Sequence, residues 1–247
     1  MKRNAGVMVL TMALVAAPLA WAGSATTKVD KVEAAKTAEL KGDLAGIHKN
    51  YSAAVLDFVT AIHFTPHNAS LYNKLGIAEL QMRDHGAASK AFKNALKYDT
   101  NNAAAYNNLG ALAYLDKKYN PAIKYLKQAL ALDESNASAH LNMAESWAGL
   151  GQMDRAMTEY ARALELNADI LSDSQEGVIA QVKTPEQRAR ISYLIAKAYA
   201  KRGNVEGALE FLRRARDGGF KELNRVYADP DFATVVQDPR LQKIVKK

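Results

Sequence analysis

One stretch decides the fold of this chain: AAAYNNLGALAYLDKKYNPAIKYLKQALALDESN, residues 103–136. The segments on either side repeat it with a 34-residue period. Equivalent places are filled by Leu75, Leu109 and Met143, and further along by Phe92, Leu126 and Tyr160. Self-similarity at a fixed period of this length is typical of a solenoid, in which each unit buries its apolar face only against its neighbours.

Each unit has the pattern of two helices. Apolar or small residues recur at helical spacing, as in Tyr106, Leu109 and Ala113, which indicates a helix with one buried stripe. Small residues stand where two backbones must approach closely, at Gly76, Gly110 and Ala144 and at Ala88, Ala122 and Ala156. Short polar stretches that can cap helices separate the units, at 65–68, 99–102 and 133–136. Three helical hairpins are therefore predicted, 69–102, 103–136 and 137–170.

These residues resemble the tetratricopeptide repeat. The family motif has a large residue, Leu-Gly and a Tyr, then Ala, an aromatic residue, Ala and Pro, and residues 103–136 match it best. The departures are Thr100, Glu134 and Ala168 in place of the final proline and His140 in place of the leading aromatic residue. The resemblance covers about 35–222 with one interruption. It implies an all-α fold, a right-handed α-solenoid of about five helix-turn-helix repeats with a short helical C-terminal cap.

The chain divides into six segments on this basis. They are a signal peptide at 1–22, a flexible leader at 23–34, four repeats at 35–170, an insertion at 171–188, a fifth repeat at 189–222 and a capping segment at 223–247. The insertion breaks the period, and Thr184-Pro185 with Gln187 marks the start of a new helix. Four apolar residues are expected to cover the end of the stack, Phe232, Val235, Leu241 and Ile244.

The segment 1–22 has the pattern of a secretory signal peptide. Lys2 and Arg3 precede an uncharged apolar run that ends in Ala20-Trp21-Ala22, so cleavage is expected before Gly23. The alternative is an anchor helix that is retained, although Pro18 would break its last turns. No other segment is apolar enough to span a membrane. We therefore expect an exported protein, periplasmic or secreted, with no transmembrane segment after cleavage.

Composition narrows the function classes. The chain has no cysteine, which excludes disulfides, thiol catalysis and thiolate metal sites. The formal net charge is +7, two units of which come from Lys2 and Arg3, and this is much weaker than a dedicated nucleic-acid binder shows. His63 and His67 have Pro66 between them and no carboxylate cluster beside them. We expect no metal, no cofactor, no nucleic-acid partner and no enzymatic activity.

The family resemblance implies where a partner would bind. The first helices of the repeats line a concave groove, and their groove-facing positions include Asn73, Lys74, Leu80, Asn107, Asn108, Tyr114, Leu141, Asn142 and Glu145. Asparagine amides can bond an extended peptide backbone, and Tyr114 and the leucines offer apolar contact. The alternative is that the asparagines bond within the array. A basic clamp for a C-terminal carboxylate, known in some family members, is disfavoured because Ser138 and Asn142 occupy its positions.

A second candidate surface lies in the last repeat. Residues 188–216 contain eight basic residues against two acidic ones. The basic patch proposed there consists of Lys197, Lys201, Arg202, Arg213, Arg214 and Arg216. It would bind an anionic envelope surface or an acidic partner. The simpler hypothesis is a solvated helix face whose arginines complement a helix C-terminus.

The sequence therefore predicts a non-enzymatic scaffold. It would bind a peptide or helix of an unidentified partner protein in the concave groove, in the envelope of a bacterium. The alternative is a protein that binds polyanions or the envelope surface through the basic last repeat.

Overall fold

The computed structural model of this chain describes residues 28–167, 169–170 and 184–245. The predicted signal peptide and most of the predicted insertion lie outside these residues. The described part is built from helices and contains no strand. The first four hairpins are α1 (Lys28–Ile47) with α2 (Tyr51–Phe64), α3 (Ala69–Gln81) with α4 (His85–Tyr98), α5 (Ala103–Leu115) with α6 (Tyr119–Leu132), and α7 (Ala137–Gly149) with α8 (Met153–Leu166).

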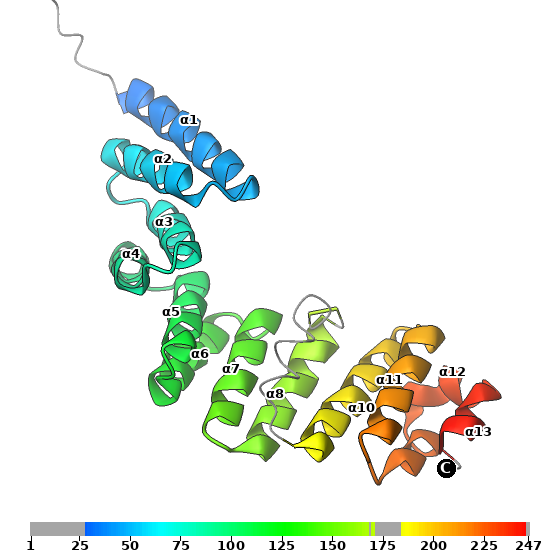
Figure 1. Cartoon of the computed structure of the whole chain (residues 1–247). Coiled ribbons are helices and arrows are strands. Elements are labelled where there is room, and N and C mark those ends of the chain that lie inside the picture. The colour runs from blue at the N-terminus through cyan, green and yellow to red at the C-terminus, as the bar shows by residue number, and fades with distance from the viewer. Residues whose placement is uncertain (1–27, 168, 171–183, 246–247) are drawn as a thin grey trace, which may run out of the picture.

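The fifth hairpin and a cap complete the described chain. The hairpin is α10 (Pro185–Lys201) with α11 (Val205–Asp217), and the cap comprises η1 (Leu223–Tyr227), η2 (Pro230–Phe232), α12 (Ala233–Val236) and α13 (Arg240–Val245). Figure 1 shows the hairpins following one another in chain order along a bent path, with α1 at one end and the C-terminus at the other. Each helix packs mainly against its hairpin partner and the adjoining hairpin. The architecture is therefore the predicted all-α solenoid.

The 34-residue period is visible in the backbone. Lys49, Arg83, Lys117 and Gly151 stand at this interval and join the two helices of successive hairpins. All four have positive φ, between 57° and 76°, in the left-handed region. This conformation ends a helix within a short turn. The hairpin turn therefore has the same backbone conformation in successive repeats, even where the residue with positive φ is not glycine.

Asparagine caps begin the first helices, as the polar stretches predicted. The Asn102 side chain accepts a hydrogen bond from the backbone N–H of Ala105 at 2.9 Å, and Asn136 accepts one from Ala139 at 2.9 Å. Asn68 does the same at the start of α3. These bonds satisfy backbone donors that have no partner inside the helix.

Small residues let the two helices of a hairpin approach closely. A methyl group added to Gly110 would lie 2.5 Å from Cγ of Leu126, and one added to Gly76 would lie 2.6 Å from the Phe92 ring. Leu126 and Phe92 are fully buried. The large side chain of the second helix therefore occupies the space that the glycine leaves open.

The first helix starts earlier than the sequence predicted. The segment 23–34 was expected to be a flexible leader, but α1 begins at Lys28. Residues 28–41 are rich in Ala, Lys and Glu, which favour a helix. Ala35 and Ala38 are buried and give this helix a packed face. Gly42, expected to weaken the helix, fits against the ring of Phe58 just as Gly76 fits against Phe92.

The short helical cap expected at the C-terminus is present. Phe232, Val235 and Leu241 have no exposed surface, and Ile244 is 2% exposed. The Phe232 ring packs against Tyr193 of α10 with a centroid separation of 5.5 Å. The cap therefore covers the apolar side of the fifth hairpin that a sixth hairpin would otherwise cover.

Candidate functional site

The predicted groove residues lie on α3, α5 and α7, the first helices of three successive hairpins. Helix α5 packs directly against both α3 and α7. The structure therefore brings these residues onto one side of the stack, where adjoining units share a surface.

Asparagines at this surface bridge successive hairpins. The Asn108 amide donates to Oδ1 of Asn73 at 2.9 Å, and the Asn142 amide donates to Oδ1 of Asn107 at 2.9 Å. Each bond joins equivalent helices of neighbouring units. Bonding within the array, the alternative left open by the sequence, therefore occurs at all four asparagines. An amide has further donors and acceptors, so these bonds leave capacity for a ligand.

Lys74 of α3 makes a similar bridge between the first two hairpins. Its ammonium group lies 2.8 Å from Oε1 of Glu39 and 2.7 Å from Oδ2 of Asp43, both on α1. Two carboxylates therefore surround one cation. This part of the surface carries net negative charge although the whole chain is basic.

The two predicted groove leucines contribute to packing. Leu80 is half-buried against the cluster around Phe92 and Leu109, and Leu141 is half-buried against the cluster of the C-terminal hairpins. Neither is an exposed apolar contact. Ile77 of α3, by contrast, is 42% exposed and lines a cavity of about 340 Å³ with Phe58 and Lys74.

Glu145 is the most unusual titratable group on this surface. It lies on α7, and no hydrogen bond or ion pair to it occurs among residues 28–167, 169–170 and 184–245. Burial raises the pKa of its carboxyl group to about 7. A buried carboxyl without a cationic partner favours its neutral form, because the charged form loses hydration that nothing replaces.

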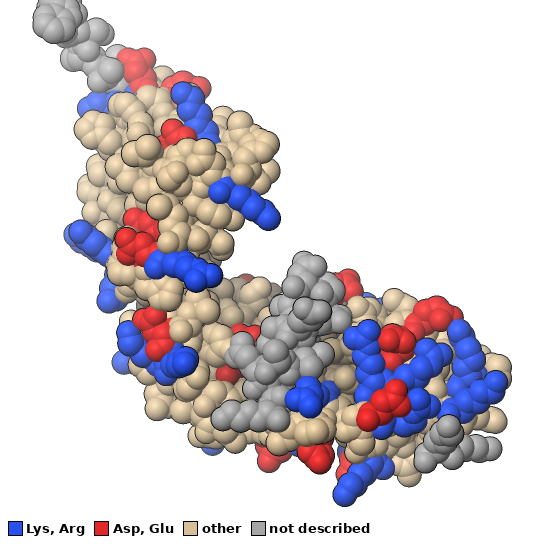
Figure 2. Space-filling model, viewed as in Figure 1, with Lys and Arg blue, Asp and Glu red and all other residues tan. Residues whose placement is uncertain are grey.

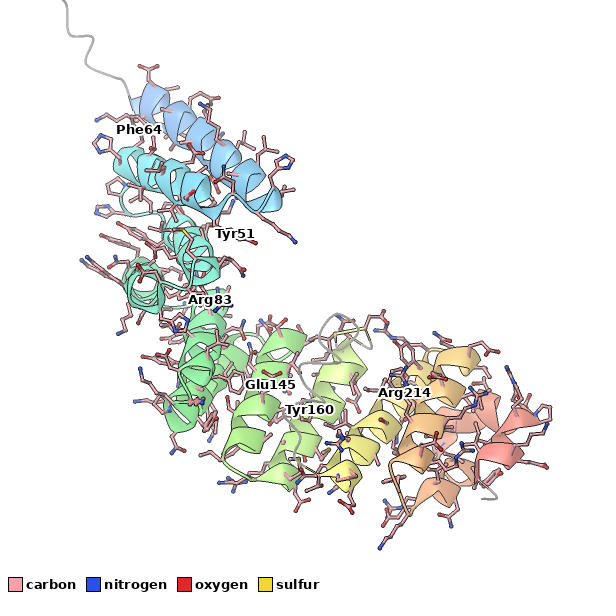
Figure 3. The ribbon with its side chains drawn as sticks, in the orientation of Figure 1. Tyr51, Phe64, Arg83, Glu145, Tyr160 and Arg214 are labelled. Atoms are coloured by element: carbon pink, nitrogen blue, oxygen red, sulfur yellow. The ribbon has the colours of Figure 1, made fainter. Side chains whose placement is uncertain are left out.

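Two tyrosines adjoin Glu145. Burial, followed by the nearby charge of Glu145, raises the pKa of both Tyr114 on α5 and Tyr160 on α8. Figure 3 shows Glu145 and Tyr160 side by side. The Tyr114 ring lies 6.1 Å from that of Tyr119. Three helices therefore contribute to one group of a carboxyl and two phenols.

Tyr160 was missed as a site residue. The repeat places it where Phe92 and Leu126 fill the core of their own units, and it is 2% exposed. The hydroxyl group of Tyr160 could have drawn attention to it in the sequence. Phe92 and Leu126, at the equivalent positions, have no polar group. A buried tyrosine usually needs a hydrogen-bond partner for its hydroxyl group.

The predicted basic patch is largely neutralised by ion pairs. Lys197 pairs with Asp229 at 2.6 Å, and Arg202 pairs with Asp169 at 3.5 Å. Arg213 and Arg214 both pair with Glu210, and Arg216 pairs with Asp217. Of the six residues, only Lys201 has no partner in the described part of the chain. Figure 2 shows acidic side chains lying among the basic ones over the C-terminal hairpin.

Other kinds of site have little support. In the residues that the structure describes, no three potential ligand side chains are grouped to hold a metal ion. No helix in the same residues is long and apolar enough to cross a bilayer. His140, expected in the core, is 8% exposed and its Nδ1 lies 2.6 Å from Oε2 of Glu159.

The stack of packed helical hairpins defines an α-solenoid of the kind that presents an extended surface. Sequence models of the tetratricopeptide repeat match residues 73–120, 113–175 and 176–220. The chain belongs to the tetratricopeptide repeat family. Proteins of this family generally act as non-enzymatic scaffolds, and protein–protein interaction is the corresponding activity here.

Solved structures show the same fold. The pilF protein of Pseudomonas aeruginosa aligns with 87% of this chain and 94% of its own, with a TM-score of 0.56 and 18% identity. A MamA fragment of Desulfovibrio magneticus RS-1 covers 80% of this chain and 98% of its own, with a TM-score of 0.54 and 15% identity. A thermophilic tetratricopeptide repeat protein of Thermus thermophilus covers 82% of this chain and 99% of its own, with a TM-score of 0.53 and 20% identity.

One curated relative matches part of the chain. A chloroplastic protein of Arabidopsis thaliana is 29% identical over 72 residues, which make up 29% of this chain and 22% of that protein. The chain thus matches about a fifth of the relative's length.

Replacing Glu145 with glutamine is expected to stabilise the protein at alkaline pH. The folded-state pKa of about 7 lies above the ordinary value of 4.5, so the folded protein holds a proton that the unfolded chain releases in this window. Stability therefore falls as pH rises from 4.5 to 7. Urea unfolding at pH 8 should show Glu145→Gln more stable than wild type by about 2 kcal/mol. The difference should shrink at acidic pH.

The exposed Glu33→Gln variant is the control for loss of one negative charge. It should unfold like wild type at both pH values. Equal stability of Glu145→Gln and wild type at pH 8 would show that the carboxyl group is well solvated in the folded protein.

Proposed function

We propose that this protein is a non-enzymatic scaffold that binds a segment of a partner protein along the surface formed by α3, α5 and α7. The observation that carries the proposal is the bonding of this surface. The Asn108–Asn73 and Asn142–Asn107 bridges fix the first helices relative to one another before any ligand arrives. A preformed surface loses little conformational entropy on binding.

The same surface retains groups that a partner could contact. Ile77 is exposed, Tyr114 is half-buried and Glu145 has no cationic partner within the described chain. The asparagine amides keep unused donors and acceptors for a peptide backbone. Apolar, aromatic, amide and carboxyl groups thus follow one another across three hairpins. An extended segment or an amphipathic helix would meet all of them.

Binding of polyanions through the last repeat has less support. Ion pairs with acidic residues of the chain already neutralise five of the six residues in the basic patch. Exposed pairs of this kind contribute little stability, but they cancel the field that would attract an anionic surface. The excess charge of the last repeat is therefore largely compensated within the chain.

The proposed setting is the bacterial envelope, and it rests on residues 1–22. Export predicts that the N-terminal residue of the protein isolated from its native cells is Gly23, because cleavage follows Ala20-Trp21-Ala22. Intact-mass measurement and N-terminal sequencing of that protein provide the test. A protein that retains Met1–Lys2 and fractionates with the cytoplasm would contradict the proposed location.

Two arginines introduced on the proposed surface should abolish partner capture. In the Ile77→Arg/Ala111→Arg variant, both substituted positions belong to the first helices and neither side chain is buried, so folding should survive. The long side chains would occupy the surface and oppose a close contact. We expect crosslinking and pull-down from native envelope, read by mass spectrometry, to lose at least about 90% of the specific partner.

The matched control carries the same charge change on the second helices. Leu56→Arg/Leu132→Arg alters exposed residues of α2 and α6 and should capture the partner like wild type. Circular dichroism of both variants checks that they fold. Capture that survives in the first variant and is lost in the control would place the binding surface on the other side of the solenoid.

A further inference from the structure

The second helices α4 and α6 carry positive charge without any acidic residue. Together they contain five lysines, and neither helix has an Asp or a Glu. The later second helices differ, because α8 and α11 carry acidic residues beside their arginines. The five lysines are exposed, and none of them forms an ion pair among the residues that the structure describes. They are Lys90, Lys93, Lys97, Lys124 and Lys127.

The repeat places four of these lysines at two equivalent positions. Lys124 follows Lys90 by one period of the repeat, and Lys127 follows Lys93 in the same way. On each helix the lysines lie on the side opposite the buried residues, since their helical spacing sets them half a turn away from the core. Figure 2 shows basic side chains projecting on the outer side of the bend where α4 lies. We call the surface formed by the five lysines the lysine face.

A cavity of about 440 Å³ connects the two helices. Its lining includes Lys93 of α4, Tyr125 of α6 and Lys118 from the turn before α6. Asp116 also lines it, but its carboxylate lies 2.9 Å from Nζ of Lys118 and 2.6 Å from Nδ1 of His85. The negative charge in the cavity is therefore already bound. The cavity brings Lys93 and Lys118 to one opening, which shows that α4 and the start of α6 share a surface.

The composition of the lysine face favours an anionic lipid surface over an acidic protein. Arginine and aromatic residues are enriched in protein interfaces and lysine is depleted there. Neither α4 nor α6 contains an arginine. Clusters of about four to eight basic residues on an amphipathic helix are typical of segments that bind anionic lipid headgroups. Flexible ammonium groups suit such a diffuse surface, because they need no fixed geometry to contact a phosphate.

Two exposed apolar residues continue the same positions into the first hairpin. Leu56 and Val59 of α2 precede Lys90 and Lys93 by one period of the repeat. They are 69% and 49% exposed. Apolar side chains combined with a basic surface are typical of proteins that lie at the boundary between headgroups and acyl chains.

We propose that the lysine face docks on the anionic headgroups of a phospholipid bilayer, and that Leu56 and Val59 enter the boundary of that bilayer. The inference goes beyond the proposed function, because it concerns the second helices, whereas the surface for the protein partner lies on α3, α5 and α7. A protein held on a membrane in this way would keep its first helices free for the partner.

The test is cosedimentation of the purified protein with vesicles. It uses the chain that begins at Gly23, the predicted mature N-terminus, so that the apolar segment 1–22 does not contribute. The vesicles contain phosphatidylglycerol and phosphatidylcholine in equal parts, or phosphatidylcholine alone. We expect partitioning into the anionic vesicles to be at least about fiftyfold stronger, because each lysine near such a surface strengthens binding by about fivefold. Salt at about 0.5 M should remove most of this preference, because it screens the charges.

Two variants with the same change in charge make the test specific. The lysine-face variant, Lys90→Gln/Lys93→Gln/Lys124→Gln/Lys127→Gln, should partition into anionic vesicles at least about twentyfold more weakly than wild type. The control removes four exposed lysines elsewhere and should partition like wild type. It is Lys31→Gln/Lys201→Gln/Lys221→Gln/Lys243→Gln.

A third variant tests the apolar contact. Leu56→Gln/Val59→Gln should weaken partitioning by at least about threefold, because less apolar area is buried in the bilayer. All the substituted residues are exposed, and circular dichroism of each variant checks that it folds.

The contrary results are distinct. Equal losses in the lysine-face variant and its control would show that only net charge matters, and would overturn the assignment to α4 and α6. Wild type that ignores anionic vesicles but binds heparin through the same four lysines would assign the face to an acidic macromolecule and overturn the lipid proposal. Unchanged partitioning of Leu56→Gln/Val59→Gln would overturn the entry of α2 into the bilayer.

Discussion

The structure depends on a close contact, in each of the first three hairpins, between a glycine of the first helix and a large residue of the second. Gly42 lies against Phe58, Gly76 against Phe92 and Gly110 against Leu126, and the three pairs follow one another at the period of the repeat. Without a side chain on the first helix the two backbones approach closely, and the large residue fills the space between them. The contact is local, so each hairpin can form its own core and then dock on its neighbours.

Docking leaves the two ends of the stack in different states. The C-terminal end is covered by Phe232, Val235 and Leu241. At the N-terminal end, by contrast, Leu40, Leu44 and Ile47 of α1 are more than half exposed. The first helices between these ends are held by asparagine and lysine bridges. Glu145 of α7 lies on this bridged surface, and burial raises the pKa of its carboxyl group to about 7.

The fold could be predicted from the sequence because its cause is periodic. The regular spacing of the units, the glycines and the polar caps are all visible without coordinates. The site was harder to predict from the sequence, because its properties depend on pairs of side chains that the repeat brings together from different units. Asn108 was predicted to face a partner but bonds Asn73, and the arginines of the last repeat have acidic neighbours. The surroundings of Glu145 include Tyr114 and Tyr160 from two other helices, which no local pattern records.

The most direct test of this account is the stability of Gly110→Ala beside that of Gly46→Ala. A methyl group on Gly110 would lie 2.5 Å from Leu126, whereas one on Gly46 would have no neighbour within 4 Å. Urea unfolding should show Gly110→Ala destabilised by about 1–3 kcal/mol, because Leu126 has to move. Gly46→Ala should be unchanged or more stable by up to about 1 kcal/mol, since alanine favours a helix. Equal stability of the two variants would contradict the claim that close contact at the glycine organises the solenoid.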